Sequence, residues 1–186
     1  MPIIGTLVII DMQKGCQDPR HGARNNPAAE DNARTLLAAW RECGHPVIHV
    51  RHDSVTPGSP LRPEKPGNAV IDGLHELPGE PVLRKSVNSA FIGTDLTERL
   101  EKLGGKVVMA GAVTDHCVST SVRMGANLGF DITLVEDACF CYAKPGPYGR
   151  MLSASTIHEA NIASLAGEFA TITTTSDLIA EKESAT

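Results

Sequence analysis

The sequence predicts an α/β fold in which a central, mostly parallel six-stranded sheet lies between two layers of helices. Two observations support this prediction. Short apolar runs alternate with longer helical stretches along the chain, and the apolar residues are mainly Val, Ile, Leu and Ala. Such alternation is typical of parallel strands joined by helical crossovers, and aliphatic residues dominate strands that are buried on both faces. We therefore expect a three-layer αβα arrangement of the Rossmann-like type.

The elements can be placed in order from the apolar runs and the turn residues that bound them. Strands are expected at residues 4–10, 47–50, 82–83, 107–110, 132–135 and 170–172. Helices are expected at residues 28–43, 94–103, 115–128, 149–165 and 176–181. Thr94 can accept a hydrogen bond from the first turn of its helix. Gly44 and Gly104 follow two helix ends, where glycine is favoured.

Length and composition fit one domain with a sizeable core. The chain has 186 residues, of which 41% are hydrophobic, and it shows neither an internal repeat nor a second domain. We therefore expect residues 1–186 to form a single domain. The one long irregular stretch, residues 53–80, contains five prolines. A loop of this length is usually functional, so we interpret it as a lid or wall over a pocket, with a surface excursion as the alternative.

Charge and cysteine content exclude several classes of protein. The formal net charge of -5 and the lack of a basic run argue against nucleic-acid binding. There is no apolar stretch of membrane-spanning length, and the first apolar segment is too short and lacks the basic start of a signal peptide. Five cysteines, an odd number, fit a reducing compartment better than a disulfide framework. We expect a soluble, cytoplasmic protein without nucleic-acid or membrane partners.

Cys117 is the most informative residue of the chain. It lies in KVVMAGAVTDHCV, where an apolar run is followed by a glycine-containing turn and a polar stretch that can begin a helix. The carboxyl ends of strands are where open α/β folds bind ligands. A thiol at a helix start also lies near the positive end of the helix dipole, which favours the thiolate. Cys117 is thus a candidate nucleophile, although most free cysteines are simply small buried hydrophobes.

Two charged residues also follow predicted strands. Asp11 comes directly after the first apolar run, where a carboxylate is costly unless it is paired or used. Lys85 follows the short run at 82–83. Each has a simpler interpretation, as a turn aspartate and as a solvated surface lysine. Together with Cys117 they supply an acid or base, a cation and a nucleophile at one edge of the predicted sheet.

The chain resembles the isochorismatase-like cysteine hydrolases over nearly its whole length. The matching segments are LVIIDMQKG, PVIHVRHDS, LRKSVNSAF, VMAGAVTDHCV and LVEDAC. The resemblance implies the isochorismatase-like form of the α/β fold and an Asp–Lys–Cys catalytic triad at Asp11, Lys85 and Cys117. It also implies a cis peptide bond between Ala112 and Val113. The backbone N–H groups of Val113 and Cys117 are then expected to form an oxyanion hole.

These residues imply hydrolysis of a C–N bond in a small amide, carbamoyl or ureido compound through a thioester. In this scheme Lys85 and the helix start lower the thiol pKa of Cys117, and Asp11 accepts the thiol proton. No cofactor is expected. One alternative is a vinyl-ether hydrolase of the isochorismatase type, which needs no nucleophilic cysteine. Another is a non-catalytic or redox-sensing protein on the same fold. Because oligomers are common in the family, a homodimer or homotetramer is expected.

The expected substrate pocket contains several further residues, and no metal is expected in it. The pocket candidates are Gln13, His52, Asn88, Phe91 and His116. The spacing of His49 and His52 could suggest metal ligands, but in a strand these positions point to opposite faces. The chain also lacks the Asp-x-His metal motif that the nicotinamidase branch carries after its second strand. This departure argues against a bound metal and against nicotinamide as the substrate.

Overall fold

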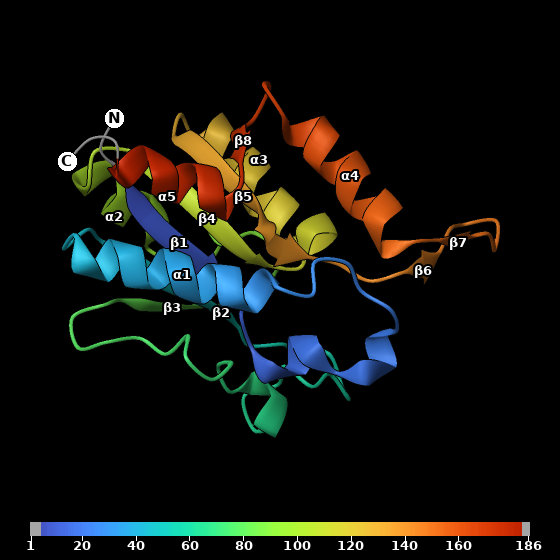
Figure 1. Cartoon of the computed structure of the whole chain (residues 1–186). Coiled ribbons are helices and arrows are strands. Elements are labelled where there is room, and N and C mark those ends of the chain that lie inside the picture. Colours follow the sequence, from blue (N-terminus) through green and yellow to red (C-terminus); the bar gives the residue numbers. More distant parts are fainter. Residues whose placement is uncertain (1–4, 184–186) are drawn as a thin grey trace.

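At the centre of the protein lies one sheet of six strands, all of them parallel (Figure 1). The computed structural model describes residues 5–183. The six strands are β1 (Thr6–Ile10), β2 (Val47–His52), β3 (Val82–Lys85), β4 (Lys106–Ala112), β5 (Asp131–Phe140) and β8 (Thr171–Thr173). Their order across the sheet is β3-β2-β1-β4-β5-β8. The predicted α/β fold with a parallel six-stranded sheet is therefore confirmed.

Strand β1 shows why the apolar runs predicted this sheet. It pairs with β2 on one side and with β4 on the other, so that Leu7 lies opposite both Val47 and Val108. The side chains of Leu7 and Ile9 pack on one face of the sheet, and those of Val8 and Ile10 pack on the other. Because both faces of the sheet are covered at this position, every residue of β1 is buried.

Helices cover both faces of the sheet and give the three layers (Figure 1). On one face lie α1 (Ala29–Glu42) and α5 (Thr175–Glu183), which contribute Trp40 and Leu178 to the core. On the other face lie α2 (Leu96–Lys102), α3 (Ser119–Asn127) and α4 (Ala154–Leu165), which contribute Leu100, Val122 and Leu165. Each face thus has its own apolar cluster. None of the helices between residues 5 and 183 has the length and apolar character that a membrane crossing requires.

Two helices differ from the prediction at their starts. The expected helix at 149–165 begins only at α4, because Ser153 accepts a hydrogen bond from the N–H of Thr156 (3.1 Å) and caps it. The residues before it form a small antiparallel hairpin of β6 (Lys144–Pro145) and β7 (Met151–Leu152), which projects from the body of the protein (Figure 1). The expected helix at 115–128 begins with a π-helical turn, η4 (Thr114–Val118), before α3.

The irregular stretch at 53–80 lies against the segment that follows β1. It contains the short 3-10 helix η3 (Pro66–Asn68), and the facing segment contains η1 (Lys14–Gln17) and η2 (Pro19–His21). The Asn68 side chain donates a hydrogen bond to the carbonyl oxygen of His52 (3.1 Å), which holds the stretch against the end of β2, and another to the carbonyl oxygen of Leu61 (2.8 Å) within the stretch itself. Residues 59–61 line the cavity described below, so this stretch forms part of its wall.

The strand order contains a switch point between β1 and β4. From β1 the chain continues to β2 on one side, whereas from β4 it continues to β5 on the other. At such a point the carboxyl ends of the strands leave a crevice in which open α/β folds bind ligands. Asp11 follows β1 at this edge, and Lys85 ends β3 at the same edge. The topology therefore places these predicted reactive residues at the same edge of the sheet.

Candidate active site

Three side chains from separate strand ends meet at the switch point. Lys85 Nζ donates a hydrogen bond to Asp11 Oδ2 (2.6 Å) and another to Cys117 Sγ (3.2 Å). The side chains of Lys85 and Asp11 are 0% and 2% exposed, so this ion pair is withdrawn from water. The structure thus brings together the three residues of the expected triad.

The backbone conformation at Asp11 positions the carboxylate of this residue. Asp11 has φ 51°, in the left-handed region that aspartate tolerates better than most residues. Its N–H still donates to the carbonyl of Val50 (2.9 Å), so the pairing of β1 with β2 continues to the residue that carries the carboxylate. On the neighbouring strand, a Cβ at Gly111 would overlap the carbonyl oxygen of Ile10. Glycine at 111 therefore lets β4 pass close to β1 beside the site.

Burial raises the pKa of both acidic groups in this triad. Desolvation raises the pKa of Asp11 above its ordinary value, although the charge of Lys85 acts in the opposite direction. Burial, followed by the charge of Asp11, raises the pKa of the Cys117 thiol to about 12, which Lys85 offsets only in part. Lys85 lowers this thiol pKa, as expected, but burial and the charge of Asp11 outweigh it, so the net shift is upward instead of downward. Cys117 rests as a thiol, and a base must remove its proton.

One oxygen of Asp11 is suited to that task. Within residues 5–183, Asp11 Oδ1 is buried and has no hydrogen-bond partner, whereas Oδ2 accepts from Lys85. A buried carboxylate oxygen without a partner is costly, and such atoms are uncommon in folded proteins. Oδ1 is therefore the atom left to accept the thiol proton or to contact a substrate, as a general base requires.

The turn that carries Cys117 is closed by one carbonyl group. The peptide bond between Ala112 and Val113 is cis. The carbonyl of Val113 accepts from the N–H groups of His116 (3.0 Å) and Val118 (3.3 Å). Both Val113 and Cys117 line the cavity, so the two residues of the expected oxyanion hole lie at the same wall.

The same turn is tied to the neighbouring helix by a buried hydrogen bond. Thr114 Oγ1 lies 2.9 Å from Nδ1 of His158, which belongs to α4. Thr114 is 0% exposed and His158 is 5% exposed, so this bond is shielded from water. The position of the nucleophile thus depends on packing between η4 and α4 as well as on the turn itself.

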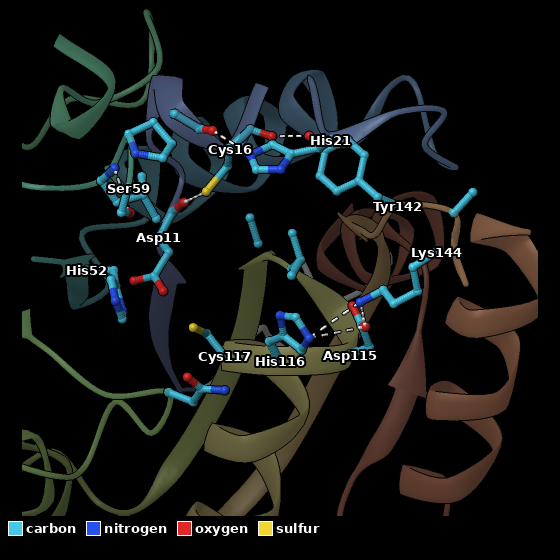
Figure 2. A pocket seen from close by; sticks show the side chains of 17 residues that line it. Asp11, Cys16, His21, His52, Ser59, Asp115, His116, Cys117, Tyr142 and Lys144 are labelled. Atoms are coloured by element: carbon cyan, nitrogen blue, oxygen red, sulfur yellow. Dashed lines mark hydrogen bonds and ion pairs between the residues drawn. The ribbon is translucent and has the colours of Figure 1, made fainter. Parts of the chain in front are cut away.

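The triad opens into a cavity of about 480 Å³, a size typical of small-molecule sites (Figure 2). Its walls come from the strand ends, the stretch at 53–80 and the segment after β5. The lining residues are Asp11, Gly15, Cys16, His21, His52, Ser59, Pro60, Leu61, Asn88, Ala112, Val113, Asp115, His116, Cys117, Tyr142, Ala143 and Lys144. Lys85 lies behind this surface and reaches the cavity through its contacts with Asp11 and Cys117.

Of the pocket residues predicted from sequence, three line the cavity and two do not. His52, Asn88 and His116 line it. Gln13 is fully buried instead, where it donates to the carbonyl of His52 (3.1 Å) and accepts from the N–H of the same residue (2.8 Å). Phe91 stacks on Phe130 in the core below α3, with ring centroids 5.7 Å apart. Gln13 and Phe91 therefore support the fold and are not part of the pocket surface.

Several polar lining residues were not predicted as pocket residues. They are Cys16, His21, Ser59, Asp115, Tyr142 and Lys144. Cys16 Sγ donates to the carbonyl of Asp11 (3.3 Å), and the hydroxyl of Tyr142 donates to the carbonyl of Cys16. Tyr142 and Lys144 follow β5, the strand next to β4. The sequence placed the end of this strand at residue 135, whereas β5 extends to Phe140, so residues 142 and 144 were not recognised as following a strand.

A cluster of possible metal ligands coincides with the triad. Asp11, His52 and Cys117 each offer one ligand atom, and these atoms lie within 4.8 Å of one another. Lys85 Nζ lies 3.1 Å from His52 Nδ1 and also donates to the other two residues. The Lys85 ammonium group thus occupies the position between the three candidate ligand atoms, where a metal ion would bind. A metal ion would have to displace Lys85 from a buried ion pair, so the geometry disfavours a metal there.

Two comparisons identify close relatives of this chain. The isochorismatase family protein YrdC of Bacillus subtilis is 43% identical over 175 residues, which cover 93% of each chain. The crystal structure of a hydrolase of the isochorismatase family from Chromobacterium violaceum matches with a TM-score of 0.93 at 43% identity. That match covers 97% of this chain and 94% of the other.

More distant relatives carry names that describe amide hydrolysis. Nicotinamidase 3 of Arabidopsis thaliana is 28% identical over 90% of this chain and 83% of that protein. Maleamate amidohydrolase of Pseudomonas putida is 28% identical over 92% of this chain and 83% of that protein. The family model described as the isochorismatase domain matches residues 6–177. This protein, with its parallel six-stranded sheet and its Asp–Lys–Cys cluster, therefore belongs to the isochorismatase family of hydrolases.

Proposed function

We propose that this hydrolase cleaves the C–N bond of a small amide, carbamoyl or ureido compound through a thioester formed on Cys117. The observation that carries the proposal is the buried contact of one ammonium group, Lys85 Nζ, with both Asp11 Oδ2 and Cys117 Sγ. A nucleophile beside a base that a third group orients is typical of covalent catalysis. The two relatives named as nicotinamidase and maleamate amidohydrolase support amide chemistry.

The first step is the transfer of the thiol proton. Because the pKa of Cys117 is about 12, little thiolate exists at neutral pH before the substrate binds. Asp11 Oδ1 accepts the proton while the sulfur attacks the carbonyl carbon of the substrate. The ammonium of Lys85, 3.2 Å from the sulfur, stabilises the negative charge that develops there.

The later steps use the backbone of the turn and return the proton. The backbone N–H groups of Val113 and Cys117 bind the oxyanion of the tetrahedral intermediate, at ~3–4 kcal/mol for each donor. Protonated Asp11 gives its proton to the leaving nitrogen, which departs as ammonia or an amine. Water activated by Asp11 then hydrolyses the thioester and restores the thiol.

In this scheme the His52 side chain helps to hold the ammonium group of Lys85 in position. Burial, with the charge of Lys85, lowers the pKa of His52 below its ordinary value. The ring is therefore neutral at neutral pH, and its Nδ1 can accept from the Lys85 ammonium at 3.1 Å. This contact leaves Lys85 with three partners that fix its position between the base and the nucleophile.

Two other functions fit the site less well. Vinyl-ether hydrolysis of the isochorismatase type leaves Cys117 without a role. A redox sensor needs a thiol that oxidises readily, and oxidation follows thiolate character. The raised pKa of Cys117 works against that requirement.

The proposal is tested by assaying ammonia release from a panel of primary amides and carbamoyl compounds. Acid-quenched samples are analysed by mass spectrometry for an acyl group on Cys117. We expect Cys117→Ala to lower the rate by on the order of 10⁴-fold or more and to abolish the adduct. Cys43→Ala is the matched control, because Cys43 is exposed. Undiminished turnover in Cys117→Ala, or turnover of a vinyl ether with no nitrogen compound hydrolysed, contradicts the proposal.

A further inference from the structure

His158 is a buried histidine that has no part in the proposed chemistry. It belongs to α4, is 5% exposed, and does not line the cavity. Its Nδ1 lies 2.9 Å from Oγ1 of Thr114, the first residue of the η4 turn that carries Cys117. A polar ring in the core is costly unless it has hydrogen-bond partners. The bond to Thr114 therefore accounts for a histidine at this position.

Helix α4 holds two consecutive residues at the start of the turn. The side chain of Val113 packs against the apolar cluster that includes Ala154 and Ile157 of α4. The next residue, Thr114, is fully buried and bonds to His158 of the same helix. Within residues 5–183, the Thr114 hydroxyl has no hydrogen-bond partner other than this ring. Apolar packing excludes water from the contact, and the hydrogen bond fixes its direction.

The backbone at this point matters for the proposed chemistry. The N–H of Val113 is one of the two proposed oxyanion donors. The peptide unit that joins Val113 to Thr114 contains the carbonyl that accepts from His116 and Val118 and so closes the turn around Cys117. Oxyanion donors act only when they lie about 3 Å from the developing charge, and a displacement of about 1 Å can cost about 100-fold in rate. A contact that fixes Thr114 therefore bears on both the donor and the nucleophile.

The direction of the hydrogen bond follows from the surroundings of the ring. Burial lowers the pKa of His158, so the ring is neutral at neutral pH and has one donor and one acceptor nitrogen. Nε2 lies 3.9 Å from Oε2 of Glu136, and a carboxylate on that side favours the proton on Nε2. Nδ1 is then the acceptor, and the hydroxyl of Thr114 donates to it.

We propose that His158 is a positioning residue that acts through Thr114 and holds the backbone of Val113 and Cys117 in the geometry that acylation requires. This inference rests on the proposed thioester chemistry and extends it to a residue outside the cavity. Its loss should slow attack on a carbonyl carbon, because that step develops an oxyanion. Alkylation of the same thiol develops no oxyanion and should be spared.

The first test compares acetylation of Cys117 by p-nitrophenyl acetate with its alkylation by iodoacetamide, both followed by site-resolved mass spectrometry. We expect His158→Leu and Thr114→Val to slow acetylation about 10- to 100-fold and to change alkylation by less than about twofold. His158→Asn, whose side-chain amide can reach the place of Nδ1, should retain most of the acetylation rate. Thr114→Ser, which keeps the hydroxyl, should do the same.

The controls separate positioning from a general loss of structure. Glu159→Gln alters the next, exposed residue of α4 and should leave both reactions unchanged. Exposed Cys43 gives the rate of a thiol outside the site. Thr114→Val preserves the shape of its side chain and carries the test if His158→Leu does not fold. Equal losses of acetylation and alkylation mean a distorted core and overturn the proposal, as does acetylation that Thr114→Val leaves unchanged.

A second test measures whether the two residues act through one bond. On the amide that the wild type hydrolyses fastest, Thr114→Val and His158→Leu should each lower kcat about 10- to 100-fold with little change in KM. The double variant should lose about as much as either single variant, because both changes remove the same bond. Losses that multiply in the double variant overturn the proposal. If no amide is hydrolysed, the proposed function is contradicted, and the acetylation test alone decides the role of His158.

Discussion

The two ends of the cavity contain the same pair of residue types at different depths. At one end the side chains of Asp11 and Lys85 are 2% and 0% exposed, and at the other those of Asp115 and Lys144 are 9% and 36% exposed. In the deep pair each charge depends on the other, because water cannot replace either partner. In the shallow pair the lysine side chain is also in contact with water. Burial, rather than residue type, therefore sets how strongly each charge depends on its partner.

The largest expected effect comes from removing the charge of the deep carboxylate. Asp11→Asn should lower amide turnover by about 10²–10⁴-fold, because the general base is lost. The same change should speed alkylation of Cys117 by iodoacetamide at pH 8, because the charge of Asp11 helps to raise the thiol pKa to about 12. Turnover and alkylation are measured on one preparation. Slower alkylation in the variant contradicts the proposed electrostatics.

The second prediction compares the two lysines through stability. Lys85→Met leaves Asp11 buried without its counter-charge and should lower the free energy of unfolding by about 3–5 kcal/mol. Lys144→Met also leaves a carboxylate, Asp115, without its lysine, but Lys144 is 36% exposed and His116 remains 3.6 Å from Asp115, so the loss should be smaller. Urea denaturation at pH 7 gives both values. Equal losses in the two variants would mean that the difference in burial has no energetic consequence.

The same comparison predicts the pH dependence of activity. Asp11 must be ionised to act as the base, and burial raises its pKa above the ordinary value. As the pH falls through this raised pKa, kcat/KM should fall about tenfold per unit. Lys85→Met should move the midpoint further upward, because the lysine lowers the pKa of Asp11. Lys144→Met, which removes the partner of Asp115, should leave the midpoint in place. A midpoint that shifts in neither variant contradicts the role of Asp11.

The sheet and the meeting of Asp11, Lys85 and Cys117 were predictable because they depend on local pattern and chain topology. The apolar run of β1 ends at Asp11, and parallel strands bring their carboxyl ends to one edge. Lys85 and Cys117 likewise follow apolar runs, and the five family segments then joined the three residues as an expected triad. Neither argument needed a side-chain position.

The remaining features depend on tertiary packing and could not be predicted. The thiol pKa of Cys117 is raised by burial and by the charge of Asp11, which together outweigh the lysine. Phe91 has the hydrophobicity of a pocket residue, but it stacks on Phe130 in the core. The β6–β7 hairpin has two-residue strands that leave no periodic signal, so Lys144 was missed. These cases show that sequence located the reactive groups better than it described their surroundings.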